Sequence, residues 1–316
     1  MISTVGKTLV TNMNIAILSF GTQNSATQRL AEAASVAGHT PHVLNPFGFY
    51  LHIGSEGKRI YYEGEPAEDF DVLLPRLSEK TVAYGAEVVF HFEWLGIPVL
   101  NRATSIINAR HKFRSLRILA EHGLPIPPSF TVGSSQFLDR AVRETGDYPF
   151  VMKPFAGTHG KAILLLDTPT SLASAVDTLC DDLHQDYVIQ PLIKEAVGKD
   201  IRVIVVGGKV IVAMRRIAPA GEFRSNIHRG GRGEIVALPD SYTDIAIRAT
   251  AAMELEVAGV DLLETDNGPV VLEVNPSPGF EIEAVTGVPI AEPIIAFAVK
   301  YSQTHRRSAS DESLHS

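Results

Sequence analysis

Three oxygen-bearing side chains near the C-terminal end of the chain have the spacing of a metal site. Residues 270–279 read Val-Val-Leu-Glu-Val-Asn-Pro-Ser-Pro-Gly, and the apolar first half predicts a short buried strand. Glu273 and Asn275 are two residues apart, so their side chains are expected on one face of it. A second apolar run, 257–263, holds Asp261. If the two strands pair, the three side chains line one side of a sheet, and their oxygens suit Mg²⁺.

The alternative for Asp261 and Glu273 is a solvated strand edge, where most carboxylates lie. The turn at 276–279 argues against it, because two prolines stiffen the exit of the strand. Mg²⁺ leaves positions for water and substrate phosphates, so the predicted site favours a phosphate-bearing substrate.

A lysine and a glycine-bearing loop upstream could hold such phosphates. Lys153 ends a predicted strand, and residues 154–160 read Pro-Phe-Ala-Gly-Thr-His-Gly before another strand at 162–166. This order differs from a Walker A loop, which continues into a helix. Backbone N–H groups of the loop could still cover phosphates, with Lys153 as a point charge. An ordinary hairpin turn would have the same pattern.

A basic segment interrupts a chain whose net charge is −8. Residues 215–232 hold five arginines and His228 against one acid, Glu222. Arginine forks match carboxylates and phosphates bidentately, although a solvated loop is the alternative. Asp200 begins a predicted strand, where an acid could accept two ribose hydroxyls.

The composition is that of an ordinary globular protein, with 45% hydrophobic and 20% charged residues among 316. The negative net charge argues against general nucleic-acid binding. Cys180 is the only cysteine, which excludes a disulfide framework and favours a reducing, cytoplasmic setting. No apolar run reaches the roughly 18 residues of a membrane-spanning helix, so no membrane span is expected.

The first lobe is predicted to contain a parallel sheet. Residues 14–20, 22–37 and 41–44 have the pattern of strand, helix and strand, which predicts a βαβ unit. A hairpin is expected around Tyr61, and the lobe is expected to end near residue 100.

Two further elements bear on the candidate site. Residues 105–121 have the spacing of one amphipathic helix with Lys112 inside it. Gly207-Gly208 between two apolar runs predicts a two-residue hairpin turn.

The order of these features is more specific than each alone, and it resembles the ATP-grasp superfamily. The chain from 14 to about 298 is similar to the RimK-type glutamate ligases. The stretches that carry the resemblance are Ala-Arg-His-Lys-Phe-Arg-Ser (109–115), Lys-Glu-Ala-Val-Gly-Lys-Asp-Ile-Arg (194–202), Phe-Arg-Ser-Asn-Ile-His-Arg-Gly-Gly (223–231), Ala-Gly-Val-Asp (258–261) and Glu-Val-Asn-Pro-Ser-Pro-Gly (273–279).

The resemblance implies an α/β ATP-grasp fold of three lobes. They are an N-terminal parallel-sheet pre-ATP-grasp lobe (13–100), a central ATP-covering lobe with the glycine loop (101–190) and a C-terminal metal-binding lobe (191–301). A flexible extension (1–12) and a disordered tail (302–316) are expected to flank them.

The resemblance also implies roles for individual residues. Lys112 and Lys153 would contact ATP phosphates, Asp200 would hold the ribose, and Arg216 and Arg224 would stabilise transition-state charge. The other implied nucleotide contacts are Gly157, Thr158, Gly160, Gln190, Pro191, Leu192, Ser225 and Asn226, with Arg224 among them. Asp261, Glu273 and Asn275 would bind two Mg²⁺ ions, or Mn²⁺. His228 and Arg229 would contact an acidic acceptor.

The implied reaction is ATP-dependent amide bond formation through an acyl phosphate. L-glutamate would be the amine, and the acceptor would be the C-terminal carboxylate of a protein (ribosomal protein S6-like) or a peptide. The enzyme is expected to be a homo-oligomer without nucleic-acid or membrane partners. The alternatives are a small-molecule carboxylate or another amino acid, and a non-catalytic ATP-binding module, which would be expected to lack a metal ligand or a phosphate lysine.

Three stretches depart from the family pattern. Pro191-Leu192 stands where members often carry Glu-Tyr, and the loop reads Ala-Gly-Thr-His-Gly instead of Glu-Gly-Thr-Gln-Gly. After Gly279, Phe-Glu-Ile-Glu-Ala replaces the usual Leu-Glu-Gly-Ile-Glu. The last change lies beside the implied acceptor region and leaves the substrate open.

Overall fold

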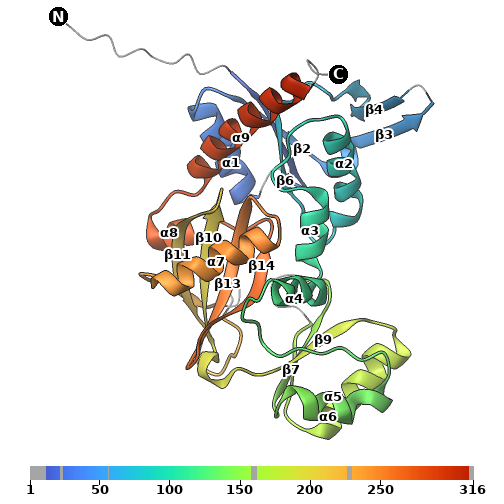
Figure 1. The fold of residues 1–316 in the computed structure, drawn as a ribbon, viewed down its shortest axis with the longest axis vertical. Helices are drawn as coiled ribbons and strands as arrows, with labels where there is room; N and C mark the ends of the chain where they lie inside the picture. Colours follow the sequence, from blue (N-terminus) through green and yellow to red (C-terminus); the bar gives the residue numbers. More distant parts are fainter. Residues whose placement is uncertain (1–11, 22–23, 56, 158–161, 226–229, 313–316) are drawn as a thin grey trace, which may run out of the picture. The chain divides into compact units, whose positions relative to one another are not determined.

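The structure of the chain, a computed structural model, describes residues 12–21, 24–55, 57–157, 162–225 and 230–312 (Figure 1). The chain divides into two units, 1–76 with 87–100 and 291–316, and 77–86 with 101–290. Residues from 291 onwards therefore belong with the first unit, whereas the predicted C-terminal lobe ran to 301. Most of the predicted N-terminal extension lies outside the described residues.

A parallel sheet in the order β2-β1-β6 forms the centre of the first unit. Five of the six residues of β1 (Asn14–Ser19) are buried, because it is the middle strand between β2 (Thr40–Leu44) and β6 (Val72–Arg76). α1 (Ser25–Val36) connects β1 to β2. The predicted βαβ unit is confirmed.

The last helix of the chain corrects the prediction of a disordered tail. α9 (Ala291–Glu312) lies beside α1 (Figure 1), and Arg29 of α1 donates to Glu292 at 3.1 Å. Ser302 is fully buried, and its hydroxyl donates to the carbonyl of Asp71 at 2.7 Å. The tail predicted from 302 is wrong up to Glu312, because a short polar side chain can pack when a backbone acceptor faces it.

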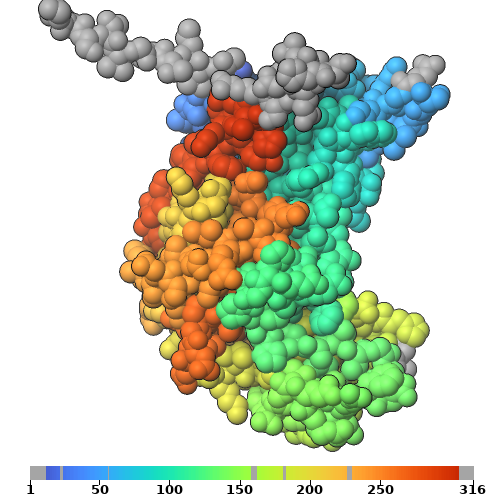
Figure 2. All heavy atoms as spheres, in the orientation of Figure 1, coloured from blue at the N-terminus to red at the C-terminus, as the bar shows by residue number. Residues whose placement is uncertain are grey.

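A second, antiparallel sheet of the first unit contains the predicted hairpin. It joins β3 (Phe49–Gly54), β4 (Gly57–Tyr62) and β5 (Glu65–Pro66) in sequence order. The hairpin of β3 and β4 is drawn in light blue in Figures 1 and 2. Phe92 of α2 (Val82–Trp94) packs against this hairpin, and the centroid of its ring lies 5.7 Å from that of Phe49.

The second unit begins with two helices where one was predicted. α3 (Ala103–Arg110) and α4 (Lys112–Glu121) are separated at His111, whose backbone is extended. The imidazole Nδ1 of His111 accepts from the N–H of Arg114 at 3.2 Å and so caps α4. The continuous helix over 105–121 is therefore wrong. The break moves Lys112 from a helix interior to the first turn of α4.

A three-stranded antiparallel sheet with two helices follows. β7 (Phe150–Pro154) lies between β8 (Leu164–Leu166) and β9 (Tyr187–Pro191), and α5 (Leu138–Thr145) and α6 (Pro169–Val176) lie beside them in Figure 1. The core of this part comprises Phe130, Leu138, Phe150, Met152, Leu166, Leu172, Val176, Tyr187 and Ile189. The strand before the glycine loop and the strand after it pair with each other, and the second strand is shorter than the predicted 162–166.

A five-stranded antiparallel sheet completes the second unit, in the order β12-β11-β10-β13-β14. Its strands are β10 (Lys199–Val206), β11 (Lys209–Ile217), β12 (Arg232–Ile235), β13 (Val257–Thr265) and β14 (Gly268–Asn275). Gly207 and Gly208 both have positive φ, at 55° and 72°, so the predicted two-residue hairpin is confirmed.

The two faces of the five-stranded sheet differ in polarity. α7 (Asp240–Ala252) covers one face, where Val203, Val260 and Val271 are buried with Ala246 and Ala249. Side chains alternate along a strand, so the residues between these core positions are directed to the opposite face. That face carries the charged residues of the candidate site.

The short helix α8 (Glu281–Thr286) follows the five-stranded sheet. Over the described part of the chain, none of the helices combines the length and the apolar character that crossing a bilayer requires.

Ser302→Ala tests the packing of α9. Loss of the hydroxyl removes the hydrogen bond to the Asp71 carbonyl at a fully buried position and should lower the free energy of unfolding by about 1 kcal/mol. Urea unfolding of the full chain measures this as a lower midpoint at unchanged slope. Gln303→Ala, at the next and exposed position, is the control and should stay within about 0.5 kcal/mol of the parent. Equal effects of the two changes would contradict the packed helix.

Candidate active site

The predicted pairing of the two acid-bearing strands is confirmed. β13 and β14 are antiparallel, with Asp261 opposite Glu273 and Gly259 opposite Asn275. The Nδ2 atom of Asn275 lies 3.5 Å from an Asp261 carboxylate oxygen. Two carboxylates and an amide therefore lie together on the polar face of the sheet.

Asp261 is buried and accepts from two arginines. Arg202 Nη2 donates to Asp261 Oδ2 at 2.9 Å, its Nε donates to Oδ1, and Arg216 Nη2 lies 3.0 Å from Oδ2. Burial opposes ionisation of Asp261, but the two guanidinium groups outweigh it and hold its pKa below the ordinary value. The two guanidinium groups thus keep a buried carboxylate charged.

Arg216 joins this pair to Asp200. Its Nε donates to Asp200 Oδ1 at 2.6 Å, and its Nη2 also donates to Asp200. Burial alone would lower the pKa of Arg216, but Asp261 and Asp200 raise it above its ordinary value. The strand register explains the contacts, because Asp200 lies opposite Arg216 and Arg202 lies opposite Asp261.

The carboxylate of Asp200 is therefore occupied by Arg216 in the described structure. A ribose would have to share or replace these contacts to bind there. The role of Asp200 in ribose binding stays a prediction.

Lys112 reaches both the glycine loop and Glu273. Its Nζ donates to the carbonyl of Gly157 at 3.0 Å and lies 3.9 Å from Glu273 Oε1. Its backbone N–H donates to Phe155 at 2.8 Å, so the first turn of α4 is fixed to the strand exit before the loop. The helix break at His111 thereby places this lysine in the site.

A chain of two side-chain hydrogen bonds holds Lys153 at the edge of the same site. Its Nζ donates to Gln190 Oε1 at 2.9 Å, and Gln190 Nε2 donates to the hydroxyl of Ser129 at 2.8 Å. The pKa of Lys153 is lowered to about 8, chiefly by burial; Glu273 opposes this shift, and Lys112 adds to it. An anion beside this amine would favour its charged form.

The donor set fits a hard divalent cation. The described residues contain no group of three or more His, Cys, Asp or Glu side chains that could hold a metal. Asp261, Glu273 and Asn275 supply two carboxylates and an amide instead, and such a partial oxygen set suits Mg²⁺, which retains water and substrate ligands.

Arg224, one of the two arginines predicted for transition-state charge, is paired elsewhere. It donates to Glu222 through Nε at 2.8 Å and through Nη2 at 2.7 Å. Ser225, its neighbour, is buried. Pro191 ends β9, and the N–H of Leu192 donates to Pro149 at 2.8 Å, so that N–H is already engaged. Five predicted site residues lie outside the described residues: Thr158, Gly160, Asn226, His228 and Arg229.

Arg202 and Arg110 were not selected from the sequence. Arg202 falls within a stretch that carries the family resemblance. It lies two residues after Asp200 on a predicted strand, a spacing that places both side chains on one face. Arg110 donates to the carbonyl of Leu77, and burial lowers its pKa while Glu273 opposes that shift. Only the tertiary arrangement places it near Glu273.

Asn101 fastens the turn after Asn275, and the sequence alone does not single it out. It is buried, and its Nδ2 donates to the carbonyls of Val257 and Pro276 at 2.8 and 2.9 Å. Its Oδ1 accepts from the N–H groups of Glu256 and Val257 at 2.7 and 2.9 Å. One side chain therefore ties the start of β13 to the residue after Asn275.

Asn101→Ala should lower the free energy of unfolding by about 3 kcal/mol, because two donors and two acceptors lose their buried partner. Chemical denaturation of the full chain, with the midpoint and slope recorded, measures this effect. Asn267→Ala, on the exposed turn between β13 and β14, is the matched control. If the free energy of unfolding falls no more in Asn101→Ala than in the control, the four hydrogen bonds of Asn101 do not stabilise this turn.

Comparison with known proteins identifies the family. Residues 109–298 match the RimK-like ATP-grasp domain, and residues 13–106 match the RimK PreATP-grasp domain. A protein of Syntrophotalea carbinolica named "Probable alpha-L-glutamate ligase" is 38% identical, and the match covers 93% of this chain and 98% of that protein. A protein of the same name from Teredinibacter turnerae is 40% identical over the same shares.

Solved structures agree on the fold. The ATP-grasp ligase PsnB, complexed with a minimal precursor, superposes with a TM-score of 0.72 at 23% identity, over 92% of this chain and 99% of PsnB. D-alanine–D-alanine ligase from Bacillus anthracis, complexed with ATP, gives 0.65 at 20% identity, over 94% and 99%. The predicted resemblance and fold class are confirmed. The chain belongs to the RimK-like ATP-grasp family of ATP-dependent ligases.

Proposed function

We propose that the protein joins the amine of L-glutamate to the C-terminal carboxylate of a protein or peptide. The acceptor carboxylate attacks the γ-phosphate of ATP to form an acyl phosphate and ADP. The amine then displaces phosphate and leaves an amide. The relatives named as glutamate ligases, at 38–40% identity over almost the whole chain, support this choice of amine.

The observation that carries the chemistry of the proposal is that two lysines interact with Glu273. The Nζ atom of Lys112 lies 3.9 Å from Oε1 of Glu273, and the charge of the same carboxylate raises the pKa of Lys153 against the effect of burial. The triphosphate, the acceptor carboxylate and the transferring phosphoryl group are all anionic, so fixed cations lower the barrier by charge stabilisation. In the proposal both lysines hold phosphates, and Gly157, Thr158 and Gly160 contact the nucleotide.

Asp261, Glu273 and Asn275 would hold Mg²⁺, as two ions, with Mn²⁺ as a substitute. When bound, the metal supplies Lewis-acid stabilisation of phosphate charge. The residues themselves orient the site, because Arg202 and Arg216 keep Asp261 ionised and fix its carboxylate.

The remaining assignments are proposed by their family positions. Arg216 and Arg224 stabilise transition-state charge, and adenine and ribose contact Gln190, Pro191, Leu192, Asp200, Ser225 and Asn226. His228 and Arg229 contact the acidic acceptor. The setting is proposed to be cytoplasmic, in keeping with the single cysteine.

Glutamate-dependent ADP release tests the function. Each amino acid is tested as the amine in the presence of ATP and Mg²⁺. The acceptors are peptides that end in glutamate, a protein, or small carboxylates, and mass spectrometry identifies the products. Mass increments of one or more glutamyl units on a peptide or protein support the proposal. Addition to a small carboxylate alone, or no glutamate-dependent ADP release with any acceptor, would overturn it.

Glu273→Gln should reduce turnover by at least about a hundredfold, because the amide keeps the shape of the side chain but removes its charge from the phosphate site. Steady-state ADP release measures the change, and circular dichroism checks the fold. Glu264→Gln on β13 is the matched control, since Glu264 pairs with Arg215 and belongs to none of the proposed contacts. Similar turnover in the two variants would contradict the metal assignment.

Lys153 gives the site a pH signature. With its pKa lowered to about 8, the lysine is charged at pH 7 and mostly neutral at pH 9, while bound phosphates favour the charged form. The affinity for ATP should therefore fall about tenfold from about pH 7 to pH 9. Titration calorimetry measures the profile, and Lys153→Arg should flatten it because a guanidinium stays charged. A flat profile in the parent protein would exclude a phosphate contact by Lys153.

A further inference from the structure

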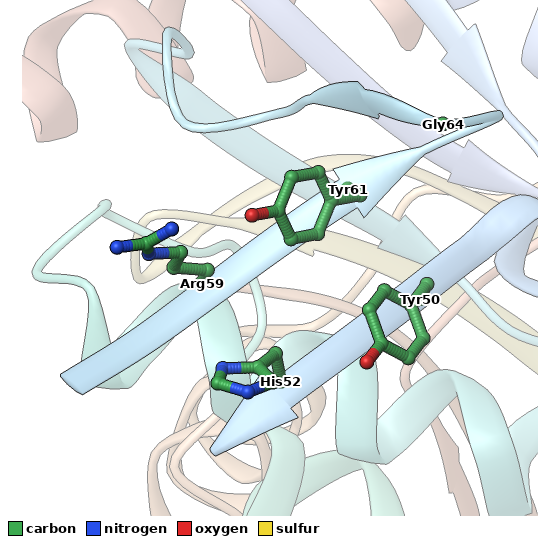
Figure 3. A pocket seen from close by; sticks show the side chains of 5 residues that line it. All are labelled: Tyr50, His52, Arg59, Tyr61 and Gly64. Carbon is green, nitrogen blue, oxygen red and sulfur yellow. The ribbon is translucent and has the colours of Figure 1, made fainter. Parts of the chain in front are cut away.

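One face of the β3–β4 hairpin in the first unit forms an open hollow, and its lining includes none of the residues assigned above. It is lined by Tyr50, His52, Arg59, Tyr61 and Gly64 (Figure 3). The strand register places Tyr50 opposite Tyr61 and His52 opposite Arg59, so the four side chains form two cross-strand pairs on the same face. Figure 3 shows both rings, the imidazole and the guanidinium standing on this face of the hairpin.

The opposite face of the hairpin is anchored to the rest of the first unit. Ile60 is fully buried, and Phe49 packs its ring 5.7 Å from that of Phe92. Lys58 lies over the Trp94 ring, with its Nζ 4.9 Å from the centroid. The lined face is therefore held on a packed support and is not a loose loop.

The lined face offers hydrogen-bond donors and is exposed. Tyr50 is 60% exposed, and Arg59 and His52 are exposed as well. Within the described residues, no ion pair or side-chain hydrogen bond engages the Arg59 guanidinium or the hydroxyls of Tyr50 and Tyr61. A guanidinium donates only, and a phenol donates readily, so the complementary ligand is an anion with several acceptor oxygens.

No carboxylate of β3, β4 or β5 shares that face in the described structure. Glu65 lies opposite Tyr62, whose side chain faces Phe49 on the anchored side, so alternation directs Glu65 away from the hollow. Among the described residues of these three strands, Arg59 therefore has no carboxylate on its own face, in a chain whose net charge is −8.

We propose that this hairpin face, Tyr50, His52, Arg59 and Tyr61, is a docking site for an acidic segment of the acceptor polypeptide. The choice of an acceptor polypeptide rests on the proposed function. Arg59 pairs with a carboxylate of that segment, the two tyrosine hydroxyls donate to carboxylate or peptide oxygens, and the rings cover its aliphatic stems. Docking here raises the local concentration of the acceptor terminus without taking part in the chemistry.

A nucleic acid is the less suited ligand. Binding to phosphate backbones draws on several cations in a row, whereas this face has one arginine and one histidine in an acidic protein. Acidic peptide and nucleic acid are therefore compared directly in the test.

The experiment measures binding without turnover. Fluorescence anisotropy follows a labelled hexaglutamate peptide with the full-length protein, without ATP or free glutamate, and hexaglutamine and a short single-stranded oligonucleotide serve as comparison probes. Arg59→Ala should weaken hexaglutamate binding about tenfold, and the double change Tyr50→Phe with Tyr61→Phe about fivefold. Arg140→Ala is the matched control, because it removes the same charge from an exposed site on α5.

A catalytic readout separates docking from the reaction. With an acceptor that carries an acidic segment, Arg59→Ala should raise KM about tenfold and leave kcat unchanged, while KM for diglutamate stays the same. Equal affinity of the Arg59, Tyr50/Tyr61 and Arg140 variants for hexaglutamate, or tighter binding of the oligonucleotide, would overturn the docking site. Because anisotropy needs no turnover, a failure of glutamate ligation would overturn the proposed function and leave the binding result readable.

Discussion

The candidate site depends on a balanced group of buried and half-buried charges on one face of the five-stranded sheet. Asp200 and Asp261 face Arg202 and Arg216, with Arg216 bridging both acids. Each of these charges alone would be costly to bury, and removal of one partner typically costs about 3–5 kcal/mol because it leaves the other uncompensated. The network therefore contributes more to orientation than to net stability, since it keeps Asp261 ionised and fixes the position of its carboxylate.

The rest of the second unit supplies what this network lacks. The opposite face of the same sheet packs on α7, so the charged face rests on an apolar core. Lys112 comes from α4 and Lys153 from β7, and both act on Glu273 at the edge of the network. Cations placed in advance around an anion site need little rearrangement when a phosphate arrives. Asn101 fixes the turn that follows Asn275, so β14 has a defined end.

Charge is distributed differently on the first unit. Its βαβ core and α9 bury apolar and small polar residues, while the β3–β4 hairpin presents Arg59 and two tyrosines on an exposed face. The protein thus separates a buried, internally neutralised set of charges from an exposed set that retains its capacity to bind. Buried charges serve orientation, because their partners are fixed, whereas exposed donors serve recognition.

The amino-acid sequence by itself determined the features that rest on short-range patterns. Alternation along two apolar runs predicted that Asp261, Glu273 and Asn275 would share a face, and the two glycines predicted the β10–β11 turn, because strand periodicity and turn chemistry are local.

Only the tertiary structure decided which partners these residues have. Asp200 meets Arg216 across the β10–β11 hairpin, and Asn101 binds backbone groups 155–175 residues further along the chain. The break before Lys112 combines the local cap by His111 with a hydrogen bond from the Lys112 N–H to the carbonyl of Phe155. The same holds for Ser302. The polar composition around it predicted a disordered tail, but its hydroxyl donates to a backbone carbonyl 231 residues away and the residue lies in a packed helix. Spacing predicts the face on which a side chain lies, but burial and pairing are set by the elements that pack against that face.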